Sequence, residues 1–184
     1  MPTLLIEHDE DGANPRENFE NLGTMACWHR RYKLGDVQPK EDPKEWLQKN
    51  VPKGSLQLPL FLFDHSGITI RTGNESFKAA DPQGWDWGRL GLIFVTPERM
   101  AQDLKEYKDG EERLKAAKEV LEAEVKVYDL YLTGQVWGYV FTDDKGEEDS
   151  CWGFYGDTLE DTGIADSVPE EAKPLLAAAW ENRK

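Results

Sequence analysis

The segment from Asp109 to Leu132 constrains the fold more than any other part of the sequence. Its apolar residues recur at spacings of three and four, which places them on one face of a helix. They are Leu114, Ala117, Leu121, Val125, Tyr128 and Leu132. Gly134 ends the pattern at a position where helices commonly stop. The segment therefore predicts one long amphipathic helix with a single apolar stripe to bury.

Short apolar runs bounded by turn residues predict strands in the rest of the chain. Hairpin turns are expected where Asp64–Gly67 and Asp143–Gly146 separate two such runs. Pro59 cannot donate to a ladder, so it favours an edge or a bulge within its run. The expected strands are residues 3–8, 24–30, 56–63, 68–72, 90–96, 135–142 and 149–155.

Three further helices are predicted from capping signals. Asp42 followed by Pro43 opens a short helix to residue 50, and Thr96 followed by Pro97 opens another. Ser167 caps a predicted C-terminal helix over 168–182. Because the strands are joined mostly by hairpins and the helices are grouped, we expect an α+β fold. It consists of a mainly antiparallel sheet of about six strands packed against the long helix and the C-terminal helix.

The length of 184 residues fits one domain, so we expect a single domain spanning residues 1–184. Hydrophobic residues make up 39% of the chain and aromatic residues 11%, which favours a packed core over disorder. Two cysteines, Cys27 and Cys151, form no Cys-x-x-Cys motif, and the N-terminus has no signal-peptide pattern. No apolar run is long enough to span a membrane, so we expect a cytoplasmic location.

A net charge of −14 is the strongest global signal. It disfavours direct binding to nucleic acid or anionic membranes and favours cationic partners, such as basic protein surfaces. The alternative is that the acidity serves only solubility or suits a cytoplasm of high salt. Residues 143–171 hold eleven acidic residues and one lysine. The candidate partner-binding surface within them comprises Asp143, Asp144, Glu147, Glu148, Asp157, Glu160 and Asp161.

Three segments resemble a family of small proteins encoded by bacteriophages and other mobile elements. They read LPLFLFDHSGITI (58–70), YDLYLTGQVWGY (128–139) and DSCWGFYG (149–156). The resemblance spans most of the chain from Asn21 to Gly156. It implies a phage or mobile-element accessory protein and brings no catalytic residues with it.

A basic and aromatic stretch at residues 28–33 is a second candidate site. Arginine binds phosphate through its planar fork, and aromatic rings stack on bases, so this stretch could hold a small nucleotide. The alternative is an exposed strand end whose arginines pair with surface acids. The candidate ligand-binding residues, drawn also from two loops elsewhere, are Trp28, Arg30, Arg31, Asp64, His65, Trp85 and Trp87.

Other motifs give little support to catalysis. Asp64, His65 and Ser66 are consecutive, so they do not form a catalytic triad and fit a polar turn. A metal centre would draw on scattered residues with no diagnostic spacing, namely His8, His29, His65, Asp9, Asp11, Asp64 and Asp149. The acidic run 9–14 does not match a calcium-loop pattern. We therefore expect no catalytic residue, no metal site and no cofactor.

Aromatic residues gather on two of the expected strands. Trp137 and Tyr139 are two residues apart, as are Trp152 and Phe154, so each pair is predicted to share a face of the sheet. Both pairs are interpreted as packing residues. Trp85 and Trp87 lie in a loop and are better candidates for an exposed anchor.

These observations lead to three hypotheses about function. The first is an accessory protein without enzymatic activity that binds and blocks a host factor, in one form as an acidic mimic of DNA occupying a nucleic-acid-binding protein. The second is a protein that sequesters or processes a small nucleotide. The third is a metal-dependent hydrolase.

Overall fold

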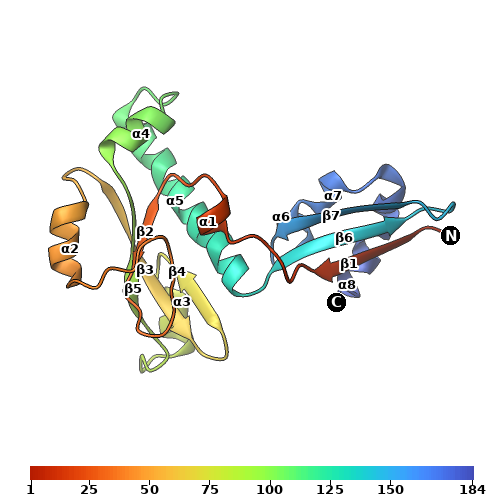
Figure 1. Cartoon of the computed structure of the whole chain (residues 1–184), viewed down its shortest axis with the longest axis horizontal. Coiled ribbons are helices and arrows are strands. Elements are labelled where there is room, and N and C mark those ends of the chain that lie inside the picture. Colours follow the sequence, from red (N-terminus) through yellow and green to blue (C-terminus); the bar gives the residue numbers. More distant parts are fainter. The chain divides into compact units, whose positions relative to one another are not determined.

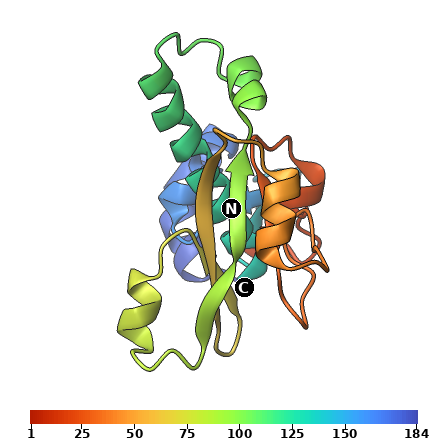
Figure 2. The same ribbon diagram turned by 90° about the vertical axis from the view of Figure 1, so that its left-hand side faces the viewer.

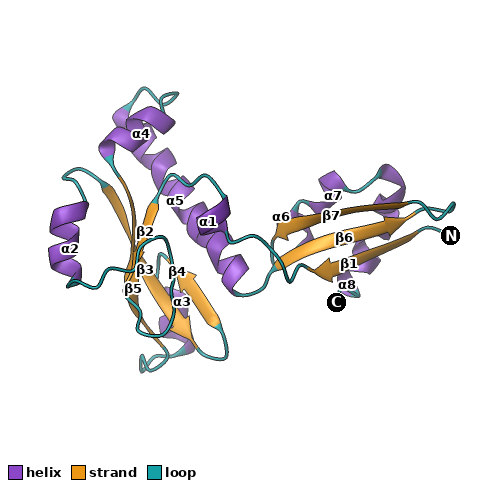
Figure 3. Ribbon diagram, viewed as in Figure 1, coloured by secondary structure: helices purple, strands orange, loops and turns teal.

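The computed structural model describes the whole chain, Met1–Lys184, as two compact units. Unit 1 comprises residues 1–15 and 130–184, and unit 2 comprises residues 16–129. The α+β class is confirmed, with seven strands and eight α-helices (Figure 3). The strands form two antiparallel sheets instead of the one that the sequence suggested, one sheet in each unit. The prediction of a single domain stays a prediction.

The sheet of unit 2 has four strands in the order β2-β5-β3-β4, all antiparallel. Their bounds are Thr24–Cys27 for β2, Leu56–Asp64 for β3, Ile68–Arg71 for β4 and Trp87–Val95 for β5. The chain leaves β2 at Cys27, three residues before the predicted end. Pro59 is tolerated because β4 pairs with β3 only from Phe61 onward, so β3 has one partner strand beside the proline.

Helices cover both faces of this sheet. On one face lies α5, Gly110–Leu132, as predicted, and on the other lies α2, Pro43–Asn50 (Figures 1 and 2). Leu121 and Ile93 both lie within 3 Å of the position that a Cβ on Gly23 would occupy, so the helix packs tightly on the sheet. On the α2 side, Trp46 packs in a buried cluster with Ala26, Leu92 and Phe94.

A buried arginine ties the loops of unit 2 to α5. The guanidinium of Arg16 donates to Asp36 at 2.9 Å, to Glu124 at 2.8 Å and to the carbonyl of Gly23 at 2.8 Å. The side chain of Arg16 is 1% exposed. Burial opposes its charge, but the hydrogen bonds and attraction of both carboxylates outweigh burial and raise the pKa of Arg16. Glu124 also accepts the N–H of Leu22 at 2.6 Å.

The sheet of unit 1 has three antiparallel strands in the order β1-β6-β7. They are β1 (Thr3–His8), β6 (Val136–Thr142) and β7 (Glu148–Tyr155), which lie side by side in Figure 1. One face of the sheet packs against helical segments that follow β7. These are α6 (Leu159–Thr162), α7 (Ile164–Ser167), the 3₁₀ helix Glu170–Leu175 and α8 (Leu176–Glu181). The core between them contains Leu4, Ile6, Trp137, Tyr139, Phe141, Ile164, Val168, Ala172 and Leu176.

The predicted helix over residues 168–182 is wrong as a continuous element. A 3₁₀ helix occupies Glu170–Leu175, and only Leu176–Glu181 is α-helical. Pro174 is the physical reason, because it has no N–H to give an α-helical bond and its ring disfavours an α-helical turn before it.

The remaining helices are α1 (Pro15–Asn18), α3 (Glu75–Ala80) and α4 (Pro97–Asp103). The predicted caps of α2 and α4 are confirmed. Asp42 accepts the N–H of Lys44 at 2.9 Å, and Thr96 accepts the N–H of Arg99 at 3.2 Å. The short helices α1, α3, α6 and α7 were not predicted, because four to six residues are too few to show a helical period. None of the helices has both the length and the apolar character required to cross a membrane.

Candidate protein-binding surface

Strand β7 is the exposed outer strand of the unit 1 sheet. Its first six residues, Glu148 to Gly153, are all exposed, and β6 is its one partner in the sheet. The hairpin before it fixes which backbone groups face β6, because the N–H of Asp143 donates to the carbonyl of Glu147 at 2.9 Å. Successive residues of a strand direct these groups to opposite sides. The N–H and C=O groups of Glu148, Ser150 and Trp152 therefore point away from the sheet.

Trp152 lies on the face of the sheet that the helices do not cover. Its indole ring lies over Gly138 of β6, where an added Cβ would stand 2.1 Å from a ring carbon. Only glycine leaves room for the ring at this position. Trp152 remains 45% exposed and Leu5 of β1 49% exposed on the same face. Val140 of β6, which is opposite Leu5, lies on this face as well.

Trp152 and Phe154 do not share a face, which corrects the prediction for this pair. Gly138 is opposite Trp152 and Trp137 is opposite Phe154, so Gly153 is an extra residue between them. Gly153 has a φ of 86°, which suits glycine and marks a bulge. Phe154 consequently packs against the core while Trp152 faces outward. The glycine between two aromatic residues was the signal that could have revealed this.

Four of the predicted acidic residues lie in the hairpin turn before β7 and at the first residue of that strand. The carboxylate of Asp143 accepts the N–H groups of Lys145 at 2.7 Å and Glu147 at 2.9 Å, so it shapes the turn. Asp144, Glu147 and Glu148 are exposed. The hairpin therefore holds three exposed acidic residues close together in a fixed turn.

The other three predicted acidic residues follow the end of β7. Asp157, Glu160 and Asp161 are exposed, and the last two lie in α6, whose cap Thr158 accepts the N–H of Asp161 at 3.1 Å. Eight strand residues at about 3.3 Å each separate the two acidic groups by roughly 26 Å. The structure thus places the seven predicted acidic residues at the two ends of one exposed strand.

A hydrogen-bonded tyrosine fixes β7 to the core. The hydroxyl of Tyr139 lies 3.0 Å from a carboxylate oxygen of Asp149 and 3.0 Å from the carbonyl of Ser167. Burial, with the hydrogen bond and the negative charge of Asp149, raises the pKa of Tyr139 to about 12. Asp149 is thus held in a fixed position on the strand.

The candidate ligand-binding residues of unit 2 come together only in part. Arg31 forms an ion pair with Asp64, and Nδ1 of His65 lies 2.8 Å from a carboxylate oxygen of Asp86. Arg30 is exposed. The pairing of Arg31 with a carboxylate leaves its charge neutralised, which weakens the case for a phosphate site there.

The three tryptophans of that set have separate surroundings. Trp28 packs edge-on against Trp46 of α2, and the ring nitrogen of Trp87 donates to the carbonyl of Asp81 at 2.9 Å. Trp85 is 82% exposed. Its loop is held by Asp81, whose pKa is lowered by hydrogen bonds from backbone N–H groups, that of Asp86 foremost. Trp85 is thus the expected exposed anchor, whereas Trp87 is half-buried.

The histidines do not gather into a metal centre. Nowhere do three or more His, Cys, Asp or Glu side chains cluster in a way that could hold a metal ion. The ring of His29 stacks on Tyr32, and Nε2 of His8 contacts the carbonyl of Gly134. The residues named for a hydrolase are therefore engaged in separate places.

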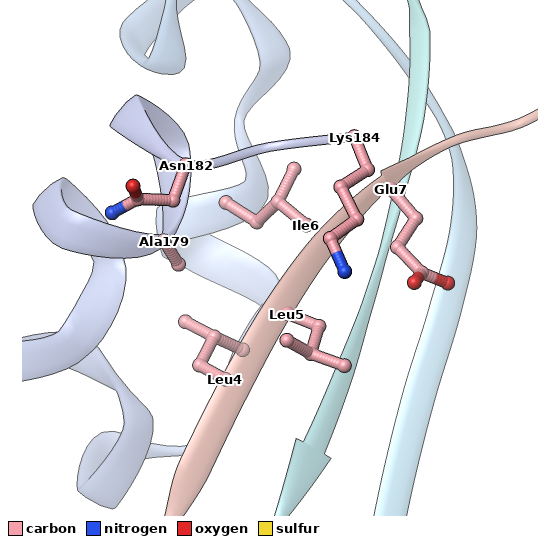
Figure 4. A pocket seen from close by; sticks show the side chains of 7 residues that line it. All are labelled: Leu4, Leu5, Ile6, Glu7, Ala179, Asn182 and Lys184. Carbon is pink, nitrogen blue, oxygen red and sulfur yellow. The ribbon is translucent and has the colours of Figure 1, made fainter.

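Two hollows of unit 1 are candidate ligand sites. A cavity of about 40 Å³ between β1 and α8 is far below the several hundred Å³ of typical ligand sites. Its lining, shown in Figure 4, is Leu4, Leu5, Ile6, Glu7, Ala179, Asn182 and Lys184. A hollow of about 330 Å³ near His8 and Tyr131 is open and includes the exposed Glu10. Within that hollow, Nε2 of His8 is already engaged by the carbonyl of Gly134.

Comparisons with known proteins yielded no relatives: no family model, no curated protein and no solved structure matches the chain. The resemblance to phage and mobile-element proteins stays a prediction.

Proposed function

We propose that this chain is an accessory protein without enzymatic activity that binds and blocks a basic, nucleic-acid-binding surface of a host protein. The observation that carries the proposal is the exposed strand β7 with acidic residues at both ends. A protein surface that binds the phosphate backbone is positively charged, so a negatively charged protein surface competes for it. The resemblance makes a protein of the infected or carrier cell, in its cytoplasm, the expected partner.

The distribution of charge supports this proposal beyond the net value of −14. Residues 143–171 contain eleven acidic residues, and Lys145 is their one basic residue. Most of the acidic side chains in this stretch are exposed, so they act on partners more than on the core. Charge complementarity of this kind speeds association and selects basic partners.

The test is capture from a host lysate on the immobilised chain, with a salt gradient and mass spectrometry of the proteins and small molecules released. We expect one stoichiometric nucleic-acid-binding protein, which salt releases and whose binding to DNA or RNA the free chain inhibits competitively. The triple variant Asp144→Asn, Glu147→Gln, Glu148→Gln should weaken its capture by about tenfold or more, since each exposed charge contributes to a desolvated complementary contact.

A matched control separates the surface from the net charge. The variant Glu111→Gln, Glu112→Gln, Glu119→Gln removes the same number of negative charges from exposed positions of α5. Capture by this control should stay within about twofold of the parent chain, because these charges lie outside the proposed surface. Equal losses in both triple variants, or capture that salt does not weaken, would contradict the proposal.

Small-nucleotide binding is the second candidate. The ion pair of Arg31 with Asp64 brings the basic stretch beside the hairpin that carries His65, although it also engages the guanidinium that would bind a phosphate. Binding of a nucleotide from a panel, lost in Arg30→Ala with the fold intact, would support this function. Retention of a nucleotide without any captured protein would replace the first proposal with this one. No observation of this kind supports the hypothesis of a metal-dependent hydrolase.

A further inference from the structure

The two sheets have four outer strands, and these are protected to very different degrees. In unit 2, β2 and β4 are four residues long, and the N–H of Cys27 in β2 donates to the carbonyl of Val37 at 2.9 Å. In unit 1, the backbone of Lys184 bonds the outer side of β1. Its carbonyl accepts the N–H of His8 at 2.7 Å, and its N–H donates to the carbonyl of Ile6 at 3.2 Å. Strand β7 is eight residues long and exposed. It is therefore the long open edge among the four.

We propose that β7 is a strand-addition site, whose outer edge binds an extended lysine- or arginine-rich segment of a partner protein as a fourth strand of the sheet. This inference rests on the proposed function and specifies how the partner binds. An unpaired edge offers alternating N–H and C=O groups that an extended peptide can bond along its backbone. Glu148, Ser150 and Trp152 supply these groups on β7.

The charges around β7 select a basic segment. Glu148 projects on the open face of the sheet and Asp149 on the helix-covered face, as their positions opposite Thr142 and Phe141 show. A strand added beside β7 therefore meets a carboxylate on each of its two faces. Glu147 adds a further exposed carboxylate in the hairpin turn, where the carboxylate of Asp144 also pairs with the N-terminal ammonium at 2.9 Å. Opposite charges on neighbouring strands stabilise a pair, whereas an acidic segment would be repelled.

The same charges disfavour a second copy of this chain as the added strand. Pairing two β7 strands would bring the carboxylates of both copies together, and each copy carries a net charge of −14. Like charges on adjacent strands destabilise the pair. The acidic residues therefore protect the edge from self-association while leaving it open to a basic segment.

Trp152 and Gly153 set the limits of the site. The bulge at Gly153 interrupts the regular alternation of β7, so the edge is regular from Glu148 to Trp152. The side chain of Trp152, 45% exposed, lies beside that edge on the uncovered face. The aliphatic part of a lysine or arginine in the added strand can pack on this ring, with the cation near its face.

The test uses a ten-residue peptide of alternating lysine and valine, and as its control the same peptide with every backbone nitrogen methylated. Both carry the same charge, but the control has no backbone N–H to donate to a ladder. We expect the lysine–valine peptide to bind about tenfold more tightly and to slow amide hydrogen exchange at Ser150 and Trp152 by about tenfold, since their N–H groups become bonded. The amide of Cys151, which faces β6, should change little.

Two variants of the chain test the edge directly. Ser150→Pro removes an outward N–H at a position where an edge strand tolerates proline, whereas Ser150→Ala keeps it. We expect Ser150→Pro to weaken peptide binding by about tenfold, because it removes a ladder bond and blocks close approach, and Ser150→Ala by less than about twofold. The circular dichroism of both variants should match the parent. The two peptides decide the question without any variant if Ser150→Pro fails to fold.

Three results would overturn strand addition. Equal binding of the two peptides would show attraction by charge alone, which leaves the proposed acidic surface standing. No binding of the lysine–valine peptide at low salt would show that the edge accepts no basic strand, while lysate capture decides the proposed function separately. Dimers seen by sedimentation that Ser150→Pro converts to monomers would show that a second copy occupies the edge.

Discussion

The two units treat the outer strands of their sheets differently. In unit 2 the outer strands are only four residues long, and β2 is further bonded by the backbone of Val37. In unit 1 the outer strand β7 has eight residues and lies open. Long open edges favour association, and proteins usually shorten, cover or charge them. Unit 2 therefore avoids association because its outer strands are short and β2 is bonded on its outer side. In unit 1 the outer edge of β7 stays open, and acidic residues lie beside it.

The interiors of the two units differ as well. Unit 2 buries the side chain of Arg16, which pairs with the partly exposed carboxylates of Asp36 and Glu124. These carboxylates also accept the backbone N–H groups of Met25 and Leu22. Unit 1 packs aromatic rings, with Trp137 and Trp180 edge to face at 5.4 Å between centroids. A buried ion network depends on every member, because an unpaired buried charge is costly. An aromatic core depends on shape, so the two units should respond to different substitutions.

The largest expected effect distinguishes the cysteines of β2 and β7. Burial foremost raises the pKa of Cys27 to about 12, whereas Cys151 is exposed. At pH 8 only about one Cys27 thiol in ten thousand is ionised, and the thiolate is the reactive form. A thiol reagent should label one cysteine in the native chain and two after unfolding, and Cys151→Ser should abolish the native labelling.

The pH dependence of this labelling has a definite sign. Labelling of Cys27 in Cys151→Ser should increase about tenfold per pH unit as the pH rises toward 12, because each unit raises the thiolate fraction tenfold. Rapid labelling of Cys27 at pH 8 would show that the β2 edge opens and would break the contrast between the two edges.

The second effect concerns the buried network of unit 2. Arg16→Met removes the cation between two carboxylates and should lower the free energy of unfolding by about 3–5 kcal/mol. Urea denaturation followed by circular dichroism measures this change. Arg99→Met, which breaks an exposed pair with Asp103, is the control and should cost less than about 1 kcal/mol. A similar small loss for Arg16→Met would mean that unit 2 does not depend on the network.

A third prediction tests whether the ring of Trp152 lies over Gly138 of β6. Gly138→Ala places a methyl group 2.1 Å from a ring carbon of Trp152, so the ring must move. We expect a loss of about 1–3 kcal/mol in thermal or urea unfolding, as for other overpacked sites. Gly88→Ala in β5 is matched to it, since an added Cβ there meets no atom within 4 Å. Equal stabilities of the two variants would show that the ring does not occupy this place.

The smallest effect concerns the hydroxyl that fixes β7 to its core. Tyr139→Phe leaves the ring and removes the hydrogen bonds with Asp149 and Ser167. Stability should fall by about 1 kcal/mol at neutral pH. Because the folded pKa of about 12 lies above the ordinary value of 10, the stability linked to Tyr139 is present below pH 10 and is lost as the pH rises through 12. Urea unfolding between pH 9 and 12 should show a smaller alkaline loss in Tyr139→Phe than in the parent.

Local signals predicted the elements that depend on neighbours in the sequence. The stripe from Ala117 to Tyr128 is buried as its spacing indicated, although Leu114 is 47% exposed. The caps at Asp42 and Thr96 accept the expected backbone bonds. Such signals work because a cap or a helical period involves residues within a few positions of each other.

The candidate sites show which features such local signals cannot predict. The acidic residues of 143–161 could be named from composition alone, because charged side chains seldom enter a core. Their position at both ends of an open strand could not, since that depends on which strand lies outermost. The pairing of Arg31 with Asp64 joins residues 33 positions apart, and no local rule predicts it.

The sequence by itself determined the α+β class, the long helix, most strand positions and the acidic character of residues 143–171. Only the tertiary structure decided that the strands form two sheets, that Gly153 turns Trp152 outward and that β7 is left without an outer partner. The reason is physical: periodicity and capping are local, whereas strand order and exposure follow from contacts between segments far apart in the chain.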